Sequence, residues 1–167
     1  MGILSKANPK ANSDRPGTVS EDEWRERLSP EQYRVLRRHG TEMAGSSPLN
    51  YEKRAGTFNC AGCGSPLFSS ETKYESGSGW PSFWAPLSED TVGSKTDYLL
   101  FYPRTEIHCA NCGGHLGHVF NDGPQPTGKR YCMNGVALQF EAQDTPAQED
   151  TGAAGSPDFK MAKANRV

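Results

Sequence analysis

The sequence predicts a mainly β fold that begins with short helices. After Thr41 helical periodicity is lost, and short runs of aromatic and β-branched residues are separated by glycine, proline, serine and asparagine. The recognisable helix-start signals all come before that point. Strands do not alternate regularly with helical segments, so a parallel sheet built from βαβ units is not expected.

Two helix-start signals occupy the first part of this region. Ser20 and Glu23 fit a capping box, in which each side chain bonds the backbone N–H of the other residue. Residues 29–32 form a second start, with serine at the cap, proline at the first helical position and glutamine three residues after the cap. We therefore expect two short helices, the second of them ending at Gly40.

The rest of the ordered chain is expected to consist of short strands. The expected strands are Gly56–Asn59, Asp97–Tyr102, Glu106–His108, Gly117–Phe120 and Arg130–Phe140. A chain of 167 residues suits one domain with tails. The segments 1–17 and 143–167 are polar or rich in small residues and are expected to be a disordered N-terminal tail and a flexible C-terminal tail. The folded domain is predicted to span residues 18–142.

Composition narrows the class of protein. Hydrophobic residues make up 34% of the chain, so the core is small and a disulfide or metal is expected to stabilise it. The chain has 18 basic and 20 acidic residues and a net charge of −2, which gives no general attraction to nucleic acid or to anionic membranes. No apolar run approaches the roughly 20 residues of a membrane span, and the first residues do not resemble a secretory signal. We expect a cytoplasmic protein.

Four of the five cysteines form two similar motifs. Each motif is C-x-x-C followed by glycine, and the pairs are Cys60 with Cys63 and Cys109 with Cys112. Two intervening residues let both sulfur atoms point to one side of a tight turn, and the glycine can adopt a positive φ that brings its N–H near a thiolate. Two such turns facing each other supply four sulfur ligands in a tetrahedron, which is the pattern of a structural zinc site. We expect one Zn²⁺ per chain, joining distant segments.

Two other interpretations of these motifs remain. They could be a pair of redox-active C-x-x-C motifs or free buried thiols. A thioredoxin-type motif follows a strand and begins a helix, a context that neither pair has. His115, three residues after Cys112, could replace one ligand, although four cysteines already suffice.

Cys132 is the remaining cysteine. Residues 130–140, taken as one strand, place Arg130, Cys132 and Asn134 on one face, with apolar residues of the strand beyond them. A nearby cation and amide favour the ionised form of a thiol, so Cys132 is a candidate nucleophile. The alternative is a small buried apolar residue, which is the usual fate of a free cysteine.

Three neighbouring segments bear on that choice. His115 and His118 could supply a proton near neutral pH, or could be structural hydrogen-bonding residues. Residues 77–84 form a glycine-hinged aromatic loop whose Trp80 could bind an apolar group beside sulfur, or could cover the core. The turn at 121–124 places Asp122 close to the histidine strand, or is only a turn.

Taken together, these motifs resemble the B-type methionine sulfoxide reductases, the peptide-methionine (R)-S-oxide reductases. The resemblance rests on both C-x-x-C pairs and on the segments Gly77–Phe83, His115–Phe120, Asp122–Pro124 and Arg130–Asn134, in that order between about residues 20 and 142. It implies two antiparallel sheets with short N-terminal helices, and zinc held by the four paired cysteines away from the reaction centre.

The resemblance also implies roles for single residues and a reaction. Cys132 corresponds to the catalytic cysteine and becomes a sulfenic acid as methionine-(R)-sulfoxide in an oxidised protein is reduced. Trp80 corresponds to the residue that packs on the ε-methyl group of the substrate, and Phe120 to an aromatic residue of the pocket wall. The resemblance assigns the remaining roles to polar residues. His115, His118 and Asn134 correspond to the groups that handle the sulfoxide oxygen and its proton. Asp122 and Arg130 correspond to the charged residues that orient those groups.

The sequence departs from the family pattern at Ser78, where many members carry a resolving cysteine. With four cysteines on zinc, no further thiol remains to form an internal disulfide with Cys132. We predict a one-cysteine enzyme whose sulfenic acid is reduced by an outside thiol, either thioredoxin or glutathione with glutaredoxin.

Two other functions compete with this interpretation. A non-enzymatic zinc-ribbon module that binds nucleic acid or protein is the main alternative, and a nucleic-acid ribbon would show a basic face that the net charge argues against. A thiol oxidoreductase acting on disulfides would need a second mobile cysteine, which the chain lacks.

Overall fold

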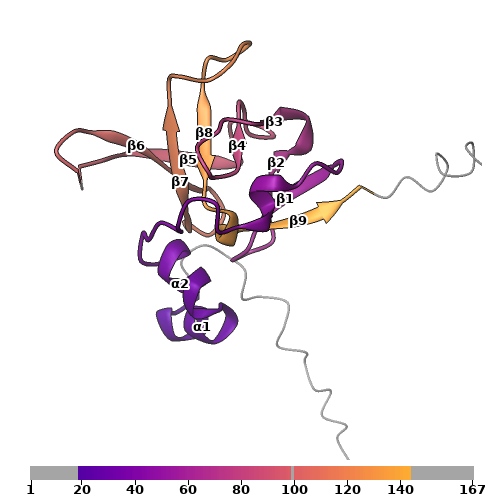
Figure 1. The fold of residues 1–167 in the computed structure, drawn as a ribbon. Helices are drawn as coiled ribbons and strands as arrows, with labels where there is room; N and C mark the ends of the chain where they lie inside the picture. Colours follow the sequence, from indigo (N-terminus) through magenta and orange to yellow (C-terminus); the bar gives the residue numbers. More distant parts are fainter. Residues whose placement is uncertain (1–18, 99, 144–167) are drawn as a thin grey trace, which may run out of the picture.

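The computed structural model describes residues 19–98 and 100–143. This part of the chain consists of two antiparallel sheets with two short helices beside them, as the sequence predicts (Figure 1). The expected tails lie outside the described residues, except for their border at Gln143. None of the described helices is long and apolar enough to cross a membrane.

The helices α1 (Glu21–Arg27) and α2 (Pro30–Leu36) begin as expected. Both predicted capping boxes are present, with Ser20 and Ser29 at the cap positions. The expected end of the second helix at Gly40 is wrong, because α2 ends at Leu36. The residue with a positive φ is His39, at 57°, and Gly40 donates its N–H to the Arg34 carbonyl.

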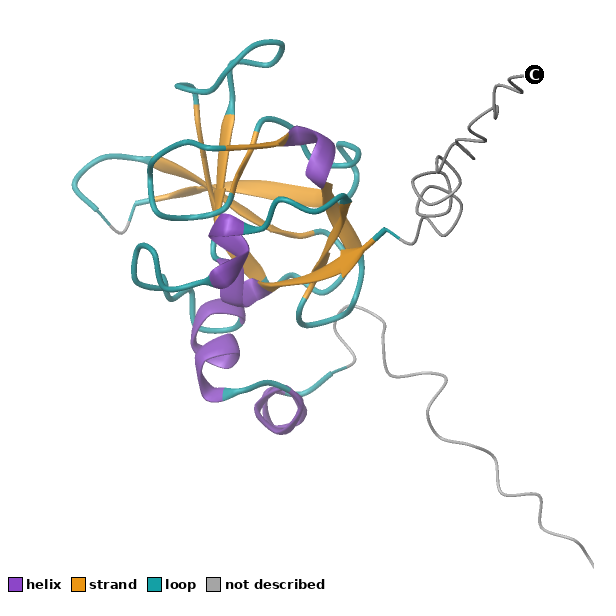
Figure 2. Cartoon of the chain, turned by 45° about the vertical axis from the view of Figure 1, so that its right-hand side comes forward, coloured by secondary structure: helices purple, strands orange, loops and turns teal. Residues whose placement is uncertain are grey.

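The described residues contain nine strands, which make up the two sheets. The smaller sheet has the order β2 (Pro66–Ser69), β1 (Gly56–Cys60) and β9 (Leu138–Ala142). The larger sheet has the order β3 (Lys73–Tyr74), β4 (Ser82–Phe83), β8 (Arg130–Met133), β7 (His115–Phe120), β6 (Arg104–Cys109) and β5 (Val92–Asp97). Short 3₁₀ turns lie at Pro48–Tyr51, Ser70–Thr72 and Gly135–Ala137. Figures 1 and 2 show α1 and α2 together below the two sheets.

Two of the expected strands are wrong in their limits. The strand expected at 97–102 lies earlier, because β5 ends at Asp97. The single strand expected at 130–140 is divided: β8 belongs to the larger sheet, and after a 3₁₀ turn β9 belongs to the smaller one. The break occurs because the carboxylate of Glu42 accepts the backbone N–H groups of Gly135 and Val136, which therefore do not bond a neighbouring strand.

An aromatic cluster joins the two sheets. Phe83 of β4 stacks on Phe68 of β2 with ring centroids 4.4 Å apart, and it meets Phe58 of β1 edge-on at 5.0 Å. All three side chains are fully buried. Since such contacts add to the burial of large apolar surfaces, this cluster holds the six-stranded sheet, which carries the site described next, against the three-stranded sheet.

Candidate active site

A cavity of about 320 Å³ opens on the larger sheet. It brings together residues from β7, β8, the loop before β4 and the segment after α2. Its wall includes Thr41, Trp80, Phe120, Arg130, Cys132 and Asn134. A cavity that joins a thiol, an indole and several polar groups has the general character of a small-molecule or side-chain site.

Cys132 lies at the centre of this site, on β8 between two neighbouring strands. It stands opposite Ser82 of β4 and His118 of β7. Directly opposite residues in a sheet have their side chains on the same face, about 5 Å apart at Cβ. Burial raises the pKa of the Cys132 thiol, and the charge of Arg130 and a hydrogen bond with Ser78 oppose that shift only in part. Burial therefore works against ionisation of Cys132, whereas the sequence pointed only to the favourable effect of the nearby cation.

His118 is held by a carboxylate that the sequence analysis did not single out. Its Nε2 lies 2.8 Å from Oδ2 of Asp97, and the same oxygen lies 3.2 Å from Nη2 of Arg104. Both His118 and Arg104 line the cavity. Asp97 fixes the orientation of the imidazole and leaves Nδ1 as its second polar atom. No local signal marks Asp97, because its partner is 21 residues away on another strand.

His115 lies behind the cavity wall instead of lining it. Its side chain is 2% exposed, and its Nδ1 lies 2.9 Å from Oε1 of Glu106, which also contacts Nδ1 of His39 at 3.1 Å. Burial lowers the pKa of His115 despite the carboxylate. Its ring meets the His118 ring edge-on at 5.5 Å. The structure therefore places His115 where it supports His118, not where it meets a ligand in the cavity.

Glu42 connects the indole and the amide of the site. Its carbonyl oxygen accepts the Trp80 indole N–H at 3.1 Å, and its backbone N–H donates to Oδ1 of Asn134 at 2.9 Å. Asn134 also donates through Nδ2 to the Leu116 carbonyl at 3.0 Å, so most of its hydrogen-bonding capacity is used within the fold. Glu42 is a second residue that the sequence analysis missed.

Arg130 and Asp122 form the outer edge of the site. Asp122 accepts two hydrogen bonds from the Arg130 guanidinium, at 2.9 and 3.1 Å, and contacts no histidine in the described residues. The guanidinium carbon lies 4.4 Å from the centroid of the Phe120 ring, a cation–π contact. Asp122 is largely exposed and does not line the cavity, so its action on the thiol passes through Arg130.

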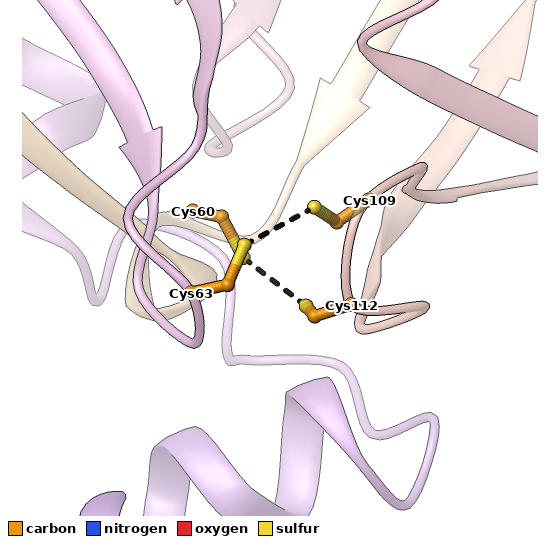
Figure 3. A group of neighbouring side chains, drawn as sticks. All are labelled: Cys60, Cys63, Cys109 and Cys112. Atoms are coloured by element: carbon orange, nitrogen blue, oxygen red, sulfur yellow. Dashed lines mark hydrogen bonds between the residues drawn. The ribbon is translucent and has the colours of Figure 1, made fainter. Parts of the chain in front are cut away.

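The four paired cysteines form a separate cluster, and none of them lines the cavity (Figure 3). Their sulfur atoms all lie within 4.8 Å of one another, with Cys60 3.7 Å from Cys112 and Cys63 3.6 Å from Cys109. A tetrahedron with Zn–S bonds of about 2.3 Å requires sulfur atoms roughly 3.8 Å apart. The cluster therefore fits zinc in both its donor atoms and its spacing.

Both C-x-x-C turns have the same backbone geometry. Gly64 and Gly113 adopt φ values of +80° and +74°, as expected for a glycine after each pair. Their N–H groups do not reach sulfur: each donates to the carbonyl of the first cysteine of its turn, at 2.8 Å. The helices cover the cluster, since Arg37 donates to the Cys112 carbonyl at 3.1 Å while its guanidinium lies 5.0 Å from the Trp24 ring.

Comparison with known proteins agrees with this geometry. The SelR domain model matches residues 28–142. The peptide methionine sulfoxide reductase MsrB of Leptospira interrogans is 55% identical over 124 residues, which cover 74% of this chain and 95% of that protein. The chain belongs to the MsrB family. The MsrB of Methanosarcina barkeri is 54% identical over 129 residues, covering 77% and 91%, and the chloroplastic peptide methionine sulfoxide reductase B1 of Arabidopsis thaliana is 46% identical over 145 residues, covering 83% and 71%.

Ser78, the residue at which the sequence departs from the expected family pattern, lies in the loop before β4. Its side chain lines the cavity together with Cys132. Its hydroxyl lies 2.8 Å from that of Ser76, which in turn lies 2.6 Å from that of Ser82. These three hydroxyl groups form a hydrogen-bonded chain from the cavity wall to Ser82, the residue opposite Cys132 on β4.

Proposed function

We propose that this MsrB-family protein reduces methionine-(R)-sulfoxide residues in oxidised proteins to methionine, with Cys132 as the nucleophile. The observation that carries the proposal is the pairing of Cys132 with His118 on adjacent strands, in the wall of a cavity that also contains Trp80. The thiol supplies the electrons, the imidazole handles the proton, and the indole provides an apolar surface for the methyl group.

The proposed reaction balances without an external proton. The Cys132 sulfur attacks the sulfoxide sulfur while the sulfoxide oxygen is protonated through His118, whose Nδ1 is not held by Asp97. The S–O bond of the substrate breaks, oxygen is transferred to Cys132 as a sulfenic acid, and methionine leaves. The thiol proton replaces the proton that His118 delivers. Burial raises the pKa of Cys132, which favours the thiol form before the substrate binds.

We assign the selectivity for one sulfoxide epimer to the two sides of the cavity. Trp80 packs against the ε-methyl group, held in place by its bond to the Glu42 carbonyl. His118 and Asn134 stand on the polar side and receive the oxygen. In the other epimer the oxygen and the lone pair on sulfur exchange places. The oxygen then points away from His118 and Asn134, so His118 no longer protonates it. Arg130, fixed by Asp122, opposes the effect of burial on the thiol pKa.

We also propose that the four-cysteine cluster holds one structural Zn²⁺. Thiolate ligands at tetrahedral spacing suit zinc, and a closed site with four protein ligands leaves no open position for a substrate. The ion would supply folding free energy by joining the turn after β1 to the turn after β6. Interaction with Cys109 raises the pKa of Cys60, because four crowded sulfur atoms do not all ionise unless a cation lies between them.

The enzyme is proposed to work with one cysteine. With the other four cysteines clustered around a metal, the Cys132 sulfenic acid is reduced by two outside thiol groups, which form a disulfide and release water. Thioredoxin or glutathione with glutaredoxin is the proposed reductant, and a cytoplasmic location, where such thiols are reduced, remains a prediction. Ser78→Cys would convert the chain into a two-cysteine enzyme if this assignment is correct.

Single-turnover chemistry tests the one-cysteine proposal. The reduced protein is mixed with an excess of N-acetyl-methionine-(R)-sulfoxide without a reductant, and the products are mapped by mass spectrometry. The unaltered chain is expected to accumulate sulfenic acid at Cys132, whereas Ser78→Cys should yield a disulfide between positions 78 and 132. A lasting internal disulfide in the unaltered chain would refute the proposal.

A second experiment tests the function as a whole. Turnover of the (R) and (S) epimers is measured with dithiothreitol as reductant for the unaltered protein and for Cys132→Ser, together with the zinc content of each. We expect (R)-selective activity that Cys132→Ser abolishes, with about one zinc per chain in both proteins. Glu71→Ala, at an exposed position that does not line this cavity, is the control and should retain activity. Full activity in Cys132→Ser would remove the basis of the mechanism.

A further inference from the structure

The loop between β5 and β6 carries an exposed apolar surface. Its described residues Tyr98, Leu100, Phe101 and Tyr102 are 75%, 47%, 110% and 59% exposed. No charged residue occurs between Asp97 and Arg104, where the chain reads Tyr-Leu-Leu-Phe-Tyr-Pro. Soluble proteins rarely leave several large apolar side chains together in water, and such groups mark interaction sites. We refer to these four described residues as the aromatic loop.

The aromatic loop is continuous with the wall of the cavity. It begins after Asp97, which holds His118, and ends before Arg104, which lines the cavity and pairs with Asp97 at 3.2 Å. Figures 1 and 2 show the β5–β6 loop projecting from the edge of the sheet, on the same side as the segment that follows α2. That segment contributes Thr41 to the cavity and carries Met43, which is 80% exposed. Exposed apolar side chains therefore occur in two segments that each lie next in the chain to a residue of the cavity wall, Arg104 or Thr41.

We propose that the aromatic loop binds the apolar residues that flank a methionine sulfoxide in an unfolded or locally opened segment of a substrate protein. The inference rests on the proposed function. It adds a substrate preference: peptides whose sulfoxide has large apolar neighbours are better substrates than peptides of the same length with small polar neighbours.

The size of the cavity indicates which part of the substrate meets the aromatic loop. A space of about 320 Å³ accommodates one side chain, so the rest of the substrate segment passes over the rim. Methionine is mostly buried among apolar residues in folded proteins, and oxidation that disrupts this packing exposes those neighbours. A loop of aromatic side chains without charge matches such a segment by burying apolar surface. The loop offers no cation to a nucleic acid or to an acidic peptide.

The test compares two variants on three substrates. Leu100→Ser/Phe101→Ser removes apolar surface from the loop. Leu87→Ser is the matched control, because Leu87 is as exposed as Leu100, at 45% against 47%, and does not line the cavity. The substrates are N-acetyl-methionine-(R)-sulfoxide and two peptides of equal length, with the sulfoxide flanked by leucine and valine in one and by glycine and serine in the other. Dithiothreitol is the reductant in every assay, so that the measured rates do not depend on the docking of a protein reductant.

The expected result is a selective loss. The double variant should lower kcat/KM about tenfold for the apolar-flanked peptide, mainly through KM, which corresponds to about 1.4 kcal/mol. It should change kcat/KM for the acetylated amino acid less than twofold, and Leu87→Ser should behave like the unaltered enzyme on all three substrates.

The other outcomes count against the proposal in distinguishable ways. An equal loss on all three substrates would show that the loop only shapes the cavity. Unchanged turnover of the apolar peptide would overturn substrate docking, and conversion of a dimer to a monomer by the same variant in sedimentation would assign the loop to a second copy of the chain. If the unaltered protein reduced no sulfoxide at all, the proposed function itself would fail, and the docking proposal with it.

Discussion

Replacing Glu42 by alanine is expected to lower the free energy of unfolding by about 2–4 kcal/mol. Glu42 is 4% exposed, and its carboxylate accepts the N–H groups of Gly135 at 2.6 Å and Val136 at 3.0 Å. A hydrogen bond to a charged group contributes about 1.5–3 kcal/mol, so two of them contribute roughly 3–6 kcal/mol. Burial raises the pKa of Glu42, so the folded protein bears a cost for desolvating this carboxylate. Replacing Glu42 by alanine removes that cost, and the net loss of stability is therefore smaller than the two hydrogen bonds alone would give.

Urea denaturation of the zinc-loaded protein measures this loss. With a slope of about 2 kcal/mol per M, the midpoint should fall by about 1–2 M. Glu42→Gln retains one acceptor oxygen, so its urea midpoint should lie between those of the unaltered protein and Glu42→Ala. Glu71→Ala, at an exposed position, is the control and should change the stability by less than about 0.5 kcal/mol.

Activity provides a second measurement on the same variants. The backbone of Glu42 holds both the Trp80 indole and the Asn134 amide, so release of the turn at 135–137 should also raise KM for the sulfoxide. A loss of stability below about 1 kcal/mol in Glu42→Ala would refute the reasoning, because it would mean that the two N–H groups are solvated or find other acceptors.

Three further predictions concern the protonation of the site. Asp97→Asn should lower kcat about 10- to 100-fold with little change in KM, because the imidazole of His118 loses the carboxylate that orients it. Arg130→Gln should raise the pKa of Cys132 further, because the guanidinium charge opposes the effect of burial on that pKa. The shift is measured as the rate of thiol alkylation against pH. An unchanged pH profile would contradict this prediction. Burial lowers the pKa of His115 below 6.5, so the imidazole binds a proton at a higher pH in the unfolded chain than in the folded one. The free energy of unfolding should therefore decrease as the pH falls through 6.5 and below. In denaturation experiments across pH, His115→Gln should make the free energy of unfolding depend less on pH in this range.

Local patterns in the sequence predicted the parts of the fold that depend on neighbouring residues. Both capping boxes are confirmed, because each involves residues only three positions apart. The strands around 56–59, 106–108 and 117–120 are confirmed with slightly different limits. The two C-x-x-C turns also follow from spacing alone, and the structure confirms that they face each other. The broad β class follows from composition and punctuation, since no helical periodicity competes after Thr41.

Features that depend on distant partners were wrong or missed. The strand at 130–140 has continuous β propensity, yet it divides because a carboxylate more than 90 residues away takes its N–H groups. Asp97 carries no motif, and its importance arises only where β5, β6 and β7 bring it to His118 and Arg104. Asp122 was expected to orient the histidines, but the structure pairs it with Arg130.

What the sequence determined by itself was the chemical inventory: one cysteine apart from two metal-type pairs, two histidines three residues apart, and an indole in a glycine-hinged loop. What the tertiary structure decided was the state and position of these groups. Burial raises the pKa of the Cys132 thiol, and β-sheet pairing places His118 opposite it while His115 lies behind. The physical reason is that residue type and spacing are local properties, whereas desolvation and hydrogen-bond partners depend on which distant segments pack around a group.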